Sequence, residues 1–391
     1  MDLKRLEIIK GLVKSEVDQG KLAGASVAIR KDGDIVFSNS YGMADIEKNI
    51  KMEMDTIIRL FSLTKPITAV ATMILFERGL IDLYHPVKWY IKSFENPMVS
   101  KNGEVKPAGR DIFIKDLLNM TSGISYPDQF TDSGRLMDKL FNDIQADTEK
   151  GVKTGTVQFM ERAGEIPLTF SPGDSWQYGL SADVLGAIIE TVSGKSYGDF
   201  LKDEIFIPLE MVDTDFYVPE EKLKRFAQIY DYNWDDGTLD IFKYIFLGVG
   251  NYHIKPSFES GGAGLVSTLN DYGRFAQMLA NGGTLDGVKI LGKKTVDFLA
   301  SNQITPEQSK VYNWESCRGY GYGNLMRVLV DQSGGQTNAD LGEFGWDGWA
   351  GDYAVINKTE NLVIQLFIQS CGAGTSDLAR KIRAVTYSAI D

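Results

Sequence analysis

An apolar stretch near the start of the chain places the strongest constraint on its fold. Residues 67–76 are almost entirely apolar. Pro66 precedes them, and proline is tolerated in the first turn of a helix because its missing N–H would be unpaired there in any case. Gly79 follows them and is typical of the residue just beyond a helix end. The pattern predicts a helix that begins near Ser62, ends before Gly79 and is buried on all sides.

The first turn of this predicted helix carries two reactive side chains, Ser62 and Lys65. Residues three apart share a helix face, so the Lys65 amine can reach the Ser62 hydroxyl. The helix N-terminus adds unpaired N–H groups and the positive end of the helix dipole. A serine with a base within reach and donors for an oxyanion has what a nucleophile requires. The alternative interpretation is a chance Ser-x-x-Lys in which Ser62 only caps the helix.

Composition and charge restrict the class of protein. The chain has 391 residues, of which 43% are hydrophobic and 24% charged, as in globular proteins with two domains or one large composite domain. Its net charge of −12 argues against nucleic acid or an anionic membrane as a partner. No apolar run reaches the roughly 18–20 residues of a membrane span. Residues 1–10 are charged and amphipathic, unlike a signal peptide, so we expect a cytoplasmic protein unless a leader has been removed.

Histidine and cysteine are too scarce to suggest a metal centre or a disulfide framework. The chain has two histidines, His85 and His253, and two cysteines, Cys317 and Cys371. Both histidines fall in predicted turns or loops, and no cysteine pair has the spacing of zinc ligands. We therefore expect no metal and no cofactor. A Ser-His-Asp triad is not indicated, so the base for a serine nucleophile is expected to be Lys65 or a tyrosine.

Hydrophobic periodicity places strands toward both ends of the chain and helices between them. Alternating runs bounded by turn residues predict strands, and spacing near 3.6 residues predicts helices. We expect helices over residues 3–19, 111–120, 181–192, 270–281 and 376–389, and strands over 25–30, 34–42, 320–330, 353–357 and 362–369. Residues 127–160 are polar with helical stretches and predict an inserted covering segment.

This order of elements predicts a mixed α/β (α+β) fold. Strands near both termini imply one central sheet to which both ends of the chain contribute. We expect an α/β sheet domain of residues 1–60 and 240–391, and a mainly helical domain of residues 61–239 inserted in it. The active site is expected at the interface of the two domains.

Three further motifs carry a resemblance to a known family. They are Leu117-Leu-Asn-Met-Thr-Ser-Gly123, Ser171-Pro-Gly-Asp-Ser-Trp-Gln-Tyr178 and the segment from Phe344 to Tyr353, which reads Phe-Gly-Trp-Asp-Gly-Trp-Ala-Gly-Asp-Tyr. In this order after Ser-x-x-Lys, the chain resembles the serine β-lactamase and penicillin-binding-protein superfamily from about residue 20 to its end. Within it, the chain is most similar to the class C β-lactamase-like branch and its family VIII carboxylesterases. The resemblance implies a β-lactamase-like fold with a central antiparallel sheet flanked by helices.

The resemblance also implies roles for individual residues. Ser62 matches the acylated nucleophile, Lys65 the lysine that helps to activate it, and Tyr178 the tyrosine that passes a proton to the leaving group. The backbone N–H groups of Ser62 and Trp349 match the oxyanion hole. Because a lysine charge favours a neighbouring phenolate, we expect the pKa of Tyr178 to be lowered, and burial to lower the pKa of Lys65.

Two departures from the family pattern concern the substrate. Leu180 stands where β-lactamases and peptidases of this branch have the asparagine of Tyr-x-Asn, and Trp346 stands where they have lysine or histidine. Leucine cannot bind a lactam or peptide amide, and tryptophan cannot pair with a carboxylate. Asp347 is unexpected and either lies at the surface or repels anionic substrates. We expect Leu180, Trp346, Asp347 and Gly348 to be substrate-binding positions for a neutral or aromatic ester.

The sequence therefore favours a serine hydrolase that acts through an acyl-enzyme, first an esterase of small, apolar or aromatic esters. Its partner is a small-molecule ester or acyl donor, and nothing in the sequence indicates the oligomeric state. The alternatives are an acyltransferase of the same fold, then a β-lactamase or D-Ala-D-Ala peptidase, and outside enzymes a non-catalytic binding protein. Six aromatic residues are candidates for an apolar substrate pocket: Tyr126, Phe130, Trp314, Tyr320, Trp346 and Trp349.

One motif predicts a different nucleophile. Residues 194–198 match Gly-x-Ser-x-Gly, which in α/β-hydrolases places a serine on a tight turn from strand to helix. Here a predicted helix precedes the motif, so we expect Ser196 to be a loop residue or the N-cap of the next helix.

Overall fold

Both ends of the chain contribute strands to one antiparallel sheet, as predicted. The computed structural model describes residues 1–243, 250 and 252–390. The sheet has eight strands in the order β12-β13-β14-β15-β16-β1-β2-β3. Its strands are β1 (Gly24–Lys31), β2 (Asp34–Asp45), β3 (Ile50–Lys51), β12 (Tyr320–Gly323), β13 (Met326–Leu329), β14 (Phe344–Asp347), β15 (Tyr353–Asn357) and β16 (Leu362–Ile368).

The junction between β1 and β16 joins the two halves of the sheet. The pairing runs from Ala25 opposite Ile368 to Lys31 opposite Leu362. Every residue of β16 and all but the last of β1 are buried, so this junction lies at the centre of the hydrophobic core. The tight turn from β1 to β2 uses Asp32 and Gly33, both with positive φ, as expected for a two-residue hairpin loop.

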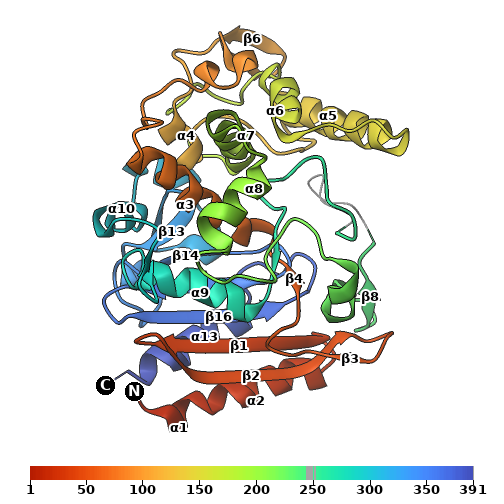
Figure 1. The fold of residues 1–391 in the computed structure, drawn as a ribbon, viewed down its shortest axis with the longest axis vertical. Helices are drawn as coiled ribbons and strands as arrows, with labels where there is room; N and C mark the ends of the chain where they lie inside the picture. Colours follow the sequence, from red (N-terminus) through yellow and green to blue (C-terminus); the bar gives the residue numbers. More distant parts are fainter. Residues whose placement is uncertain (244–249, 251, 391) are drawn as a thin grey trace.

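Helices cover both faces of the sheet (Figure 1). On one face lie α1 (Leu3–Leu6), α2 (Ile8–Asp18) and α13 (Asp377–Ser388). In this arrangement the apolar side chains of Leu6, Ile9 and Val13 are completely buried. The predicted helix over residues 3–19 is therefore two helices with a short break at Glu7. On the other face lie α9 (Leu269–Ala280) and α3 (Thr64–Glu77).

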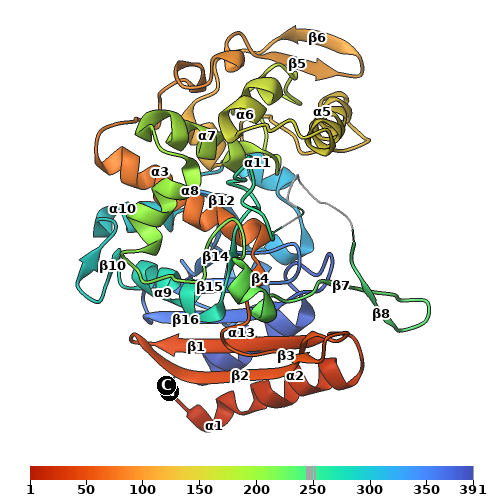
Figure 2. The same ribbon diagram turned by 45° about the vertical axis from the view of Figure 1, so that its right-hand side comes forward.

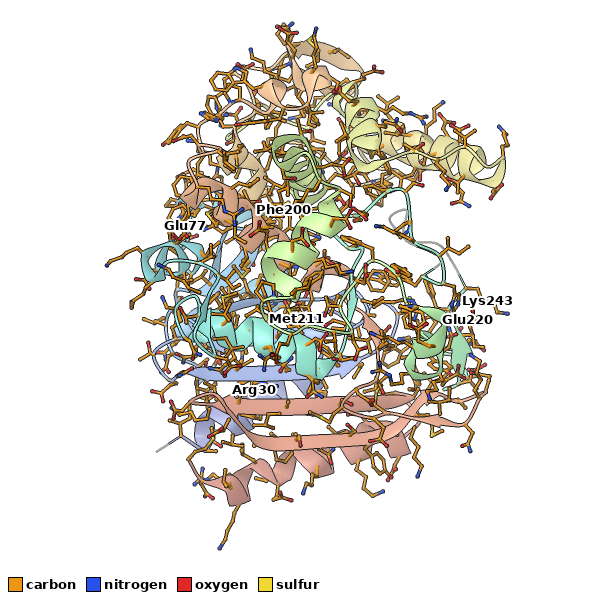
Figure 3. The ribbon with its side chains drawn as sticks, viewed as in Figure 1. Arg30, Glu77, Phe200, Met211, Glu220 and Lys243 are labelled. Atoms are coloured by element: carbon orange, nitrogen blue, oxygen red, sulfur yellow. The ribbon has the colours of Figure 1, made fainter. Side chains whose placement is uncertain are left out.

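The predicted buried helix is α3. All residues from Thr64 to Leu75 are buried, and Gly79 follows the helix end with φ +67°. A short 3₁₀ turn over Phe61–Leu63 precedes the helix, so Ser62 lies just before the α-helical segment. At the other end Glu77 accepts a hydrogen bond of 2.7 Å from Gly292 N, which ties α3 to the start of α10 (Lys293–Leu299; Figure 3).

The helices far from the sheet come from the middle of the chain (Figures 1 and 2). They are α4 (Ile114–Leu118), α5 (Asp132–Glu149), α6 (Thr156–Gly164), α7 (Ser181–Ser193) and α8 (Tyr197–Leu201), accompanied by the hairpin of β5 (Met98–Lys101) and β6 (Glu104–Pro107). The polar segment 127–160 contains α5 and α6, as its helical stretches predicted. Figure 1 shows α5 extending outward from this group.

The strand-like run 320–330 differs from its prediction. It is the hairpin of β12 and β13, because Asn324 and Leu325 both adopt positive φ and reverse the chain. Short pairs connect the remaining segments: β4 (Ile58–Arg59) with β9 (Val266–Ser267), β7 (Tyr230–Tyr232) with β8 (Leu239–Ile241), and β10 (Thr284–Leu285) with β11 (Val288–Lys289). The remaining α-helices of the described chain are α11 (Pro306–Val311) and α12 (Gln332–Gly335). In the described part of the chain, no helix has the length and apolarity needed to cross a bilayer.

Candidate active site

The backbone presents Ser62 through a strained residue. Phe61 has φ +42°, which is unusual for a residue with a side chain, and it sits between β4 and α3. The pairing of β4 with β9 and the hydrogen bond from Leu60 N to Leu265 O, 2.9 Å, fix this bend. Non-glycine residues in the left-handed region persist only where the surroundings hold them, and they cluster at functional sites. Ser62 itself is almost buried, with 7% of the residue exposed.

Lys65 is fully buried and its amine touches Ser62. Its Nζ donates to Ser62 Oγ at 3.0 Å, to Tyr126 Oη at 3.0 Å and to the Gly262 carbonyl at 2.7 Å. These three acceptors match the three protons of an ammonium group. Burial lowers the pKa of Lys65 to about 7, although the carboxylates of Asp183 and Asp347 act in the opposite direction. A lysine with this pKa can serve as a base near neutral pH.

Tyr178 lies on the other side of Ser62, within an aromatic cluster. Its phenol is hydrogen-bonded to the Ser62 hydroxyl, and it accepts a hydrogen bond of 2.9 Å from Trp346 Nε1. The Lys65 amine lies 4.5 Å from the centre of the Tyr178 ring. Four further rings have their centres 5.3–6.2 Å away, those of Tyr126, Trp176, Trp314 and Trp346.

The pKa of Tyr178 is opposite in direction to the sequence prediction. Burial raises the pKa of Tyr178 above the ordinary phenol value, and this effect exceeds the lowering by its hydrogen bonds with Ser62 and Trp346. The prediction of a lowered pKa was wrong because it considered the lysine charge without the surrounding aromatic rings. Near neutral pH Tyr178 is therefore a proton donor, and Lys65 is the group that can lose its proton.

Asp183 holds the loop that binds the lysine. It lies in the first turn of α7 and is 1% exposed. Its carboxylate accepts hydrogen bonds from Ser260 Oγ at 2.5 Å and from Gly262 N at 3.1 Å. Because the Gly262 carbonyl accepts a hydrogen bond from Lys65, this carboxylate connects the α7 N-terminus to the Lys65 amine. Neither Asp183 nor Gly262 was predicted from the sequence as a site residue, although an acid in the first turn of a buried helix was a signal for Asp183.

The segment after β14 comes close to the backbone that carries Ser62. A Cβ on Gly348 would lie 2.6 Å from the Leu60 carbonyl oxygen, so no larger residue fits there without a shift. The ring of Trp349 packs edge-on against Phe61 with centres 5.4 Å apart. The backbone of Gly348 and Trp349 therefore faces the turn that holds the nucleophile candidate.

Comparison with known proteins identifies the family. The sequence model described as "Beta-lactamase" matches residues 9–386, almost the whole chain. The chain belongs to the β-lactamase family. It is a member of the serine β-lactamase and penicillin-binding-protein superfamily, near the family VIII esterases.

Two relatives and one solved structure illustrate the similarity. Esterase EstB of Burkholderia gladioli is 27% identical over 94% of this chain and 91% of its own length. Lovastatin esterase of Penicillium rubens is 28% identical over 92% of this chain and 90% of its own length. The structure of "EstCE1, a hydrolase with promiscuous acyltransferase activity" superimposes with a TM-score of 0.81 at 22% identity, covering 98% of this chain and 99% of that one. The family and the two esterase relatives support a serine hydrolase.

The positions at which this β-lactamase-family chain departs from the lactam-cleaving pattern are largely buried. Leu180 is 1% exposed and packs into the main core, and Trp346 is 2% exposed with its indole N–H bonded to Tyr178. Asp347 forms an ion pair of 2.8 Å with Arg327, whose side chain is 1% exposed, and also accepts a hydrogen bond from Thr375. The Asp347 carboxylate is thus held by the buried Arg327 of the neighbouring strand β13.

The six aromatic candidates divide between the site and other parts of the fold. Tyr126, Trp314 and Trp346 surround Tyr178, and Trp349 packs on Phe61. The other two do not join them. Phe130 is 93% exposed, and the phenol of Tyr320, at the start of β12, donates to Glu343.

The remaining motifs have structural roles. Ser196 is the N-cap of α8 and accepts a hydrogen bond from Asp199 N, as predicted. His85 bonds through Nδ1 to the phenol of Tyr90, and both cysteines are free thiols. Among the described residues, no group of three or more His, Cys, Asp or Glu side chains is placed to hold a metal ion.

Proposed function

We propose that this protein is an esterase that acts through an acyl-enzyme on Ser62. One observation carries the proposal: a fully buried lysine amine, with a pKa of about 7, lies 3.0 Å from the hydroxyl of a serine at the start of a buried helix. A serine becomes nucleophilic when an adjacent base can take its proton. We also propose that the site lies at the junction of a sheet domain, residues 1–60 and 240–391, and a helical domain, residues 61–239.

In the first step the neutral Lys65 amine accepts the Ser62 proton. The Ser62 oxygen then attacks the ester carbonyl carbon and forms a tetrahedral intermediate. The proposed oxyanion hole consists of the backbone N–H groups of Ser62 and Trp349, and the close approach of Gly348 to Leu60 supports this placement.

In the second step the intermediate collapses and the bond to the alcohol oxygen breaks. Tyr178 donates its proton to the departing alkoxide, consistent with its raised pKa. The Lys65 ammonium, whose Nζ lies 4.5 Å from the centre of the Tyr178 ring, then returns a proton to the phenolate and becomes neutral again. Deacylation uses the same steps in reverse. Water takes the place of the alcohol and attacks the acyl-Ser62 ester, and the carboxylic acid is released.

The surroundings favour an ester over a β-lactam. Trp346 and Leu180 are both buried, the first bonded to Tyr178 and the second packed in the core. Neither offers the cation or the amide partner that a penicillin would require. The exposed edge of Trp314, 43% accessible beside Tyr178, provides an apolar surface for a small or aromatic ester.

Acyl transfer to an alcohol is the second candidate. The aromatic cluster around Tyr178 favours it, because apolar walls disfavour water and can accommodate an alcohol acceptor. Hydrolysis in the presence of added 1-butanol separates the two activities by the ratio of butyl ester to free acid.

The proposed roles of Lys65 and Tyr178 are tested by substitution. General acid–base groups contribute ~10²–10⁴-fold to the rate. We expect Lys65→Ala and Tyr178→Phe each to lower kcat for p-nitrophenyl acetate by at least about 100-fold, with the circular dichroism spectrum of the folded protein retained. Ser196→Ala is the matched control and should keep its activity. A rate near that of the unmodified protein in Tyr178→Phe would remove the tyrosine from the mechanism.

A further inference from the structure

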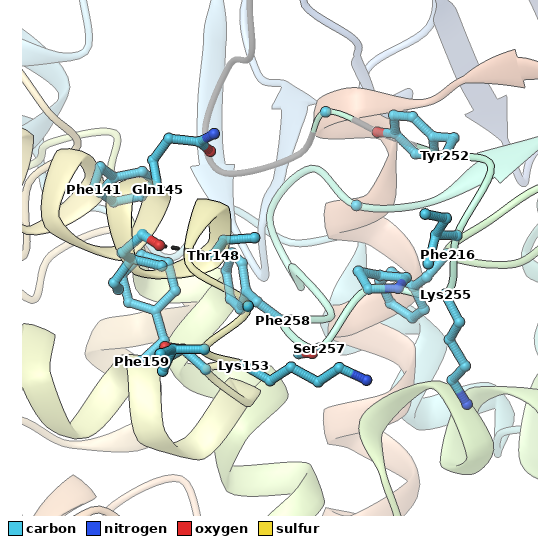
Figure 4. A pocket seen from close by; sticks show the side chains of 18 residues that line it. Phe141, Gln145, Thr148, Lys153, Phe159, Phe216, Tyr252, Lys255, Ser257 and Phe258 are labelled. Atoms are coloured by element: carbon cyan, nitrogen blue, oxygen red, sulfur yellow. Dashed lines mark hydrogen bonds between the residues drawn. The ribbon is translucent and has the colours of Figure 1, made fainter.

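A cavity lies between α5, α6 and the segment that leads to Gly264. It has a volume of about 410 Å³, within the range of small-molecule sites. Its wall is mainly apolar, as Figure 4 shows, and includes Phe141, Ile144, Phe159, Phe216, Tyr252 and Phe258. The Phe159 ring packs against Phe141 at 4.9 Å and Phe258 at 4.5 Å between centres, so the aromatic wall is continuous.

Two lysines lie at the edge of this apolar wall. Lys153 and Lys255 both line the cavity, and Figure 4 shows their side chains extending along its lower rim. Lys255 is 51% exposed and has only long contacts of 3.8 Å with Asp199 and Glu259. Lys153 forms no ion pair with any residue in the described part of the chain. Two weakly compensated cations beside an apolar cavity are notable in a chain with a net charge of −12.

The cavity is separate from the catalytic candidates but shares a segment with them. None of Ser62, Lys65 and Tyr178 lines it. Gly264 lines the cavity, whereas Gly262, two residues earlier, binds the Lys65 amine through its carbonyl. One short segment therefore faces the cavity on one side and holds the lysine on the other.

We propose that this cavity binds an aliphatic carboxylate of medium or long chain. The hydrocarbon tail of the ligand lies among the aromatic rings, where burial of its methylene groups supplies the affinity. The carboxylate lies at the rim, where Lys153 and Lys255 provide charge-assisted hydrogen bonds. This site goes beyond the proposed esterase function and does not depend on it.

Calorimetric titration with carboxylates below their micellar concentration tests the proposal. Dodecanoate should bind saturably with one molecule per chain. Each methylene added between octanoate and dodecanoate should tighten Kd by about fourfold. Dodecan-1-ol, which has the same chain without the charge, should bind roughly tenfold more weakly. Absence of saturable dodecanoate binding, or equal binding of the alcohol, overturns the proposal.

Matched variants locate the ligand. Thr148→Trp fills the cavity from α5, and Asn142→Trp places the same side chain on an exposed, non-lining position of that helix. A variant that carries both Lys153→Met and Lys255→Met removes the two charges at the rim. Its control is Lys150→Met, because Lys150 lies outside the cavity. The lining variants should each weaken dodecanoate binding at least tenfold and the controls should not. Equal affinity in lining and control variants places the ligand elsewhere and contradicts the proposal.

The ligand can be a free fatty acid or the acid released from an ester substrate. Thr148→Trp distinguishes these sources through the ratio of kcat/KM for p-nitrophenyl dodecanoate and p-nitrophenyl acetate. A selective loss for the long ester identifies the cavity as the acyl site, and an unchanged ratio identifies an independent ligand. Ser62→Ala should bind dodecanoate like the unmodified protein, so failure of the esterase proposal leaves this test intact.

Discussion

Burial of the Lys65 amine is the residue-scale feature on which the chemistry depends. Within the described residues, the hydrogen-bond partners of the amine are two hydroxyls and a carbonyl, and none of them carries a compensating charge. Desolvation therefore disfavours the charged form, while the nearby carboxylates of Asp183 and Asp347 only partly compensate. The balance places the lysine pKa where a base is useful at neutral pH.

This balance predicts the pH dependence of activity. With a pKa of about 7, Lys65 is protonated and inactive as a base below that pH and neutral above it. We expect kcat/KM for p-nitrophenyl acetate to rise from pH 5 to 8 with a midpoint near 7. Asp183→Asn removes a charge that raises the lysine pKa, so its profile should move to lower pH. A profile that does not move in Asp183→Asn would contradict electrostatic coupling between the two groups.

The sequence located the residues whose signal is local and missed those whose contacts are distant. Ser62 and Lys65 are three apart in one motif, and Tyr178 ends another. Tyr126, expected only as an aromatic pocket residue, and Gly262 approach Lys65 from 61 and 197 residues away, so only the folded chain shows their hydrogen bonds to the amine. The same limit explains the wrong direction predicted for the pKa of Tyr178, since its aromatic enclosure is built from separate segments.

At the scale of elements, strand β14 connects the candidate site to the central sheet. Trp346 points toward Tyr178, and the next residue, Asp347, pairs with the buried Arg327 of β13. Local patterns predicted the buried helix, the β1–β2 hairpin and the strands near both termini. They did not predict the β12–β13 hairpin, because the reversal depends on the backbone conformation of Asn324 and Leu325.

The Arg327–Asp347 pair should be required for stability. Breaking a buried ion pair leaves one charge without compensation and typically costs about 3–5 kcal/mol. We expect Asp347→Asn to lower the free energy of unfolding by about 3 kcal/mol in urea titration. The surface pair of Lys139 and Asp143 provides the control, since Asp143→Asn should have little effect. Equal stability of Asp347→Asn and Asp143→Asn would show that Arg327 finds another partner.

At the scale of the whole molecule, the fold brings together four segments that lie far apart in the sequence. Ser62 follows β4, Tyr178 precedes α7, Gly262 precedes β9 and Trp349 follows β14. The order of motifs predicted this family architecture, and the match over residues 9–386 confirms it. The fold does not fix the preferred substrate, and the proposed preference for esters rests on the departures at Leu180 and Trp346.

These departures predict the choice between ester and lactam. Each missing polar contact costs roughly 1–3 kcal/mol, so two could lower the specificity constant for a penicillin-like substrate by about 10- to 10⁴-fold. We expect ready hydrolysis of short p-nitrophenyl esters and slow turnover of nitrocefin when kcat/KM is measured for both on one preparation. A higher kcat/KM for nitrocefin would mean that other residues replace the missing asparagine and lysine.

The central claim, that Ser62 is the acylated nucleophile, is tested most directly by mass spectrometry after treatment with a fluorophosphonate. The account predicts one adduct per chain, on the peptide that contains Ser62, and no adduct on Ser62→Ala. An adduct on Ser196, or an active enzyme that remains unlabelled at Ser62, would contradict it.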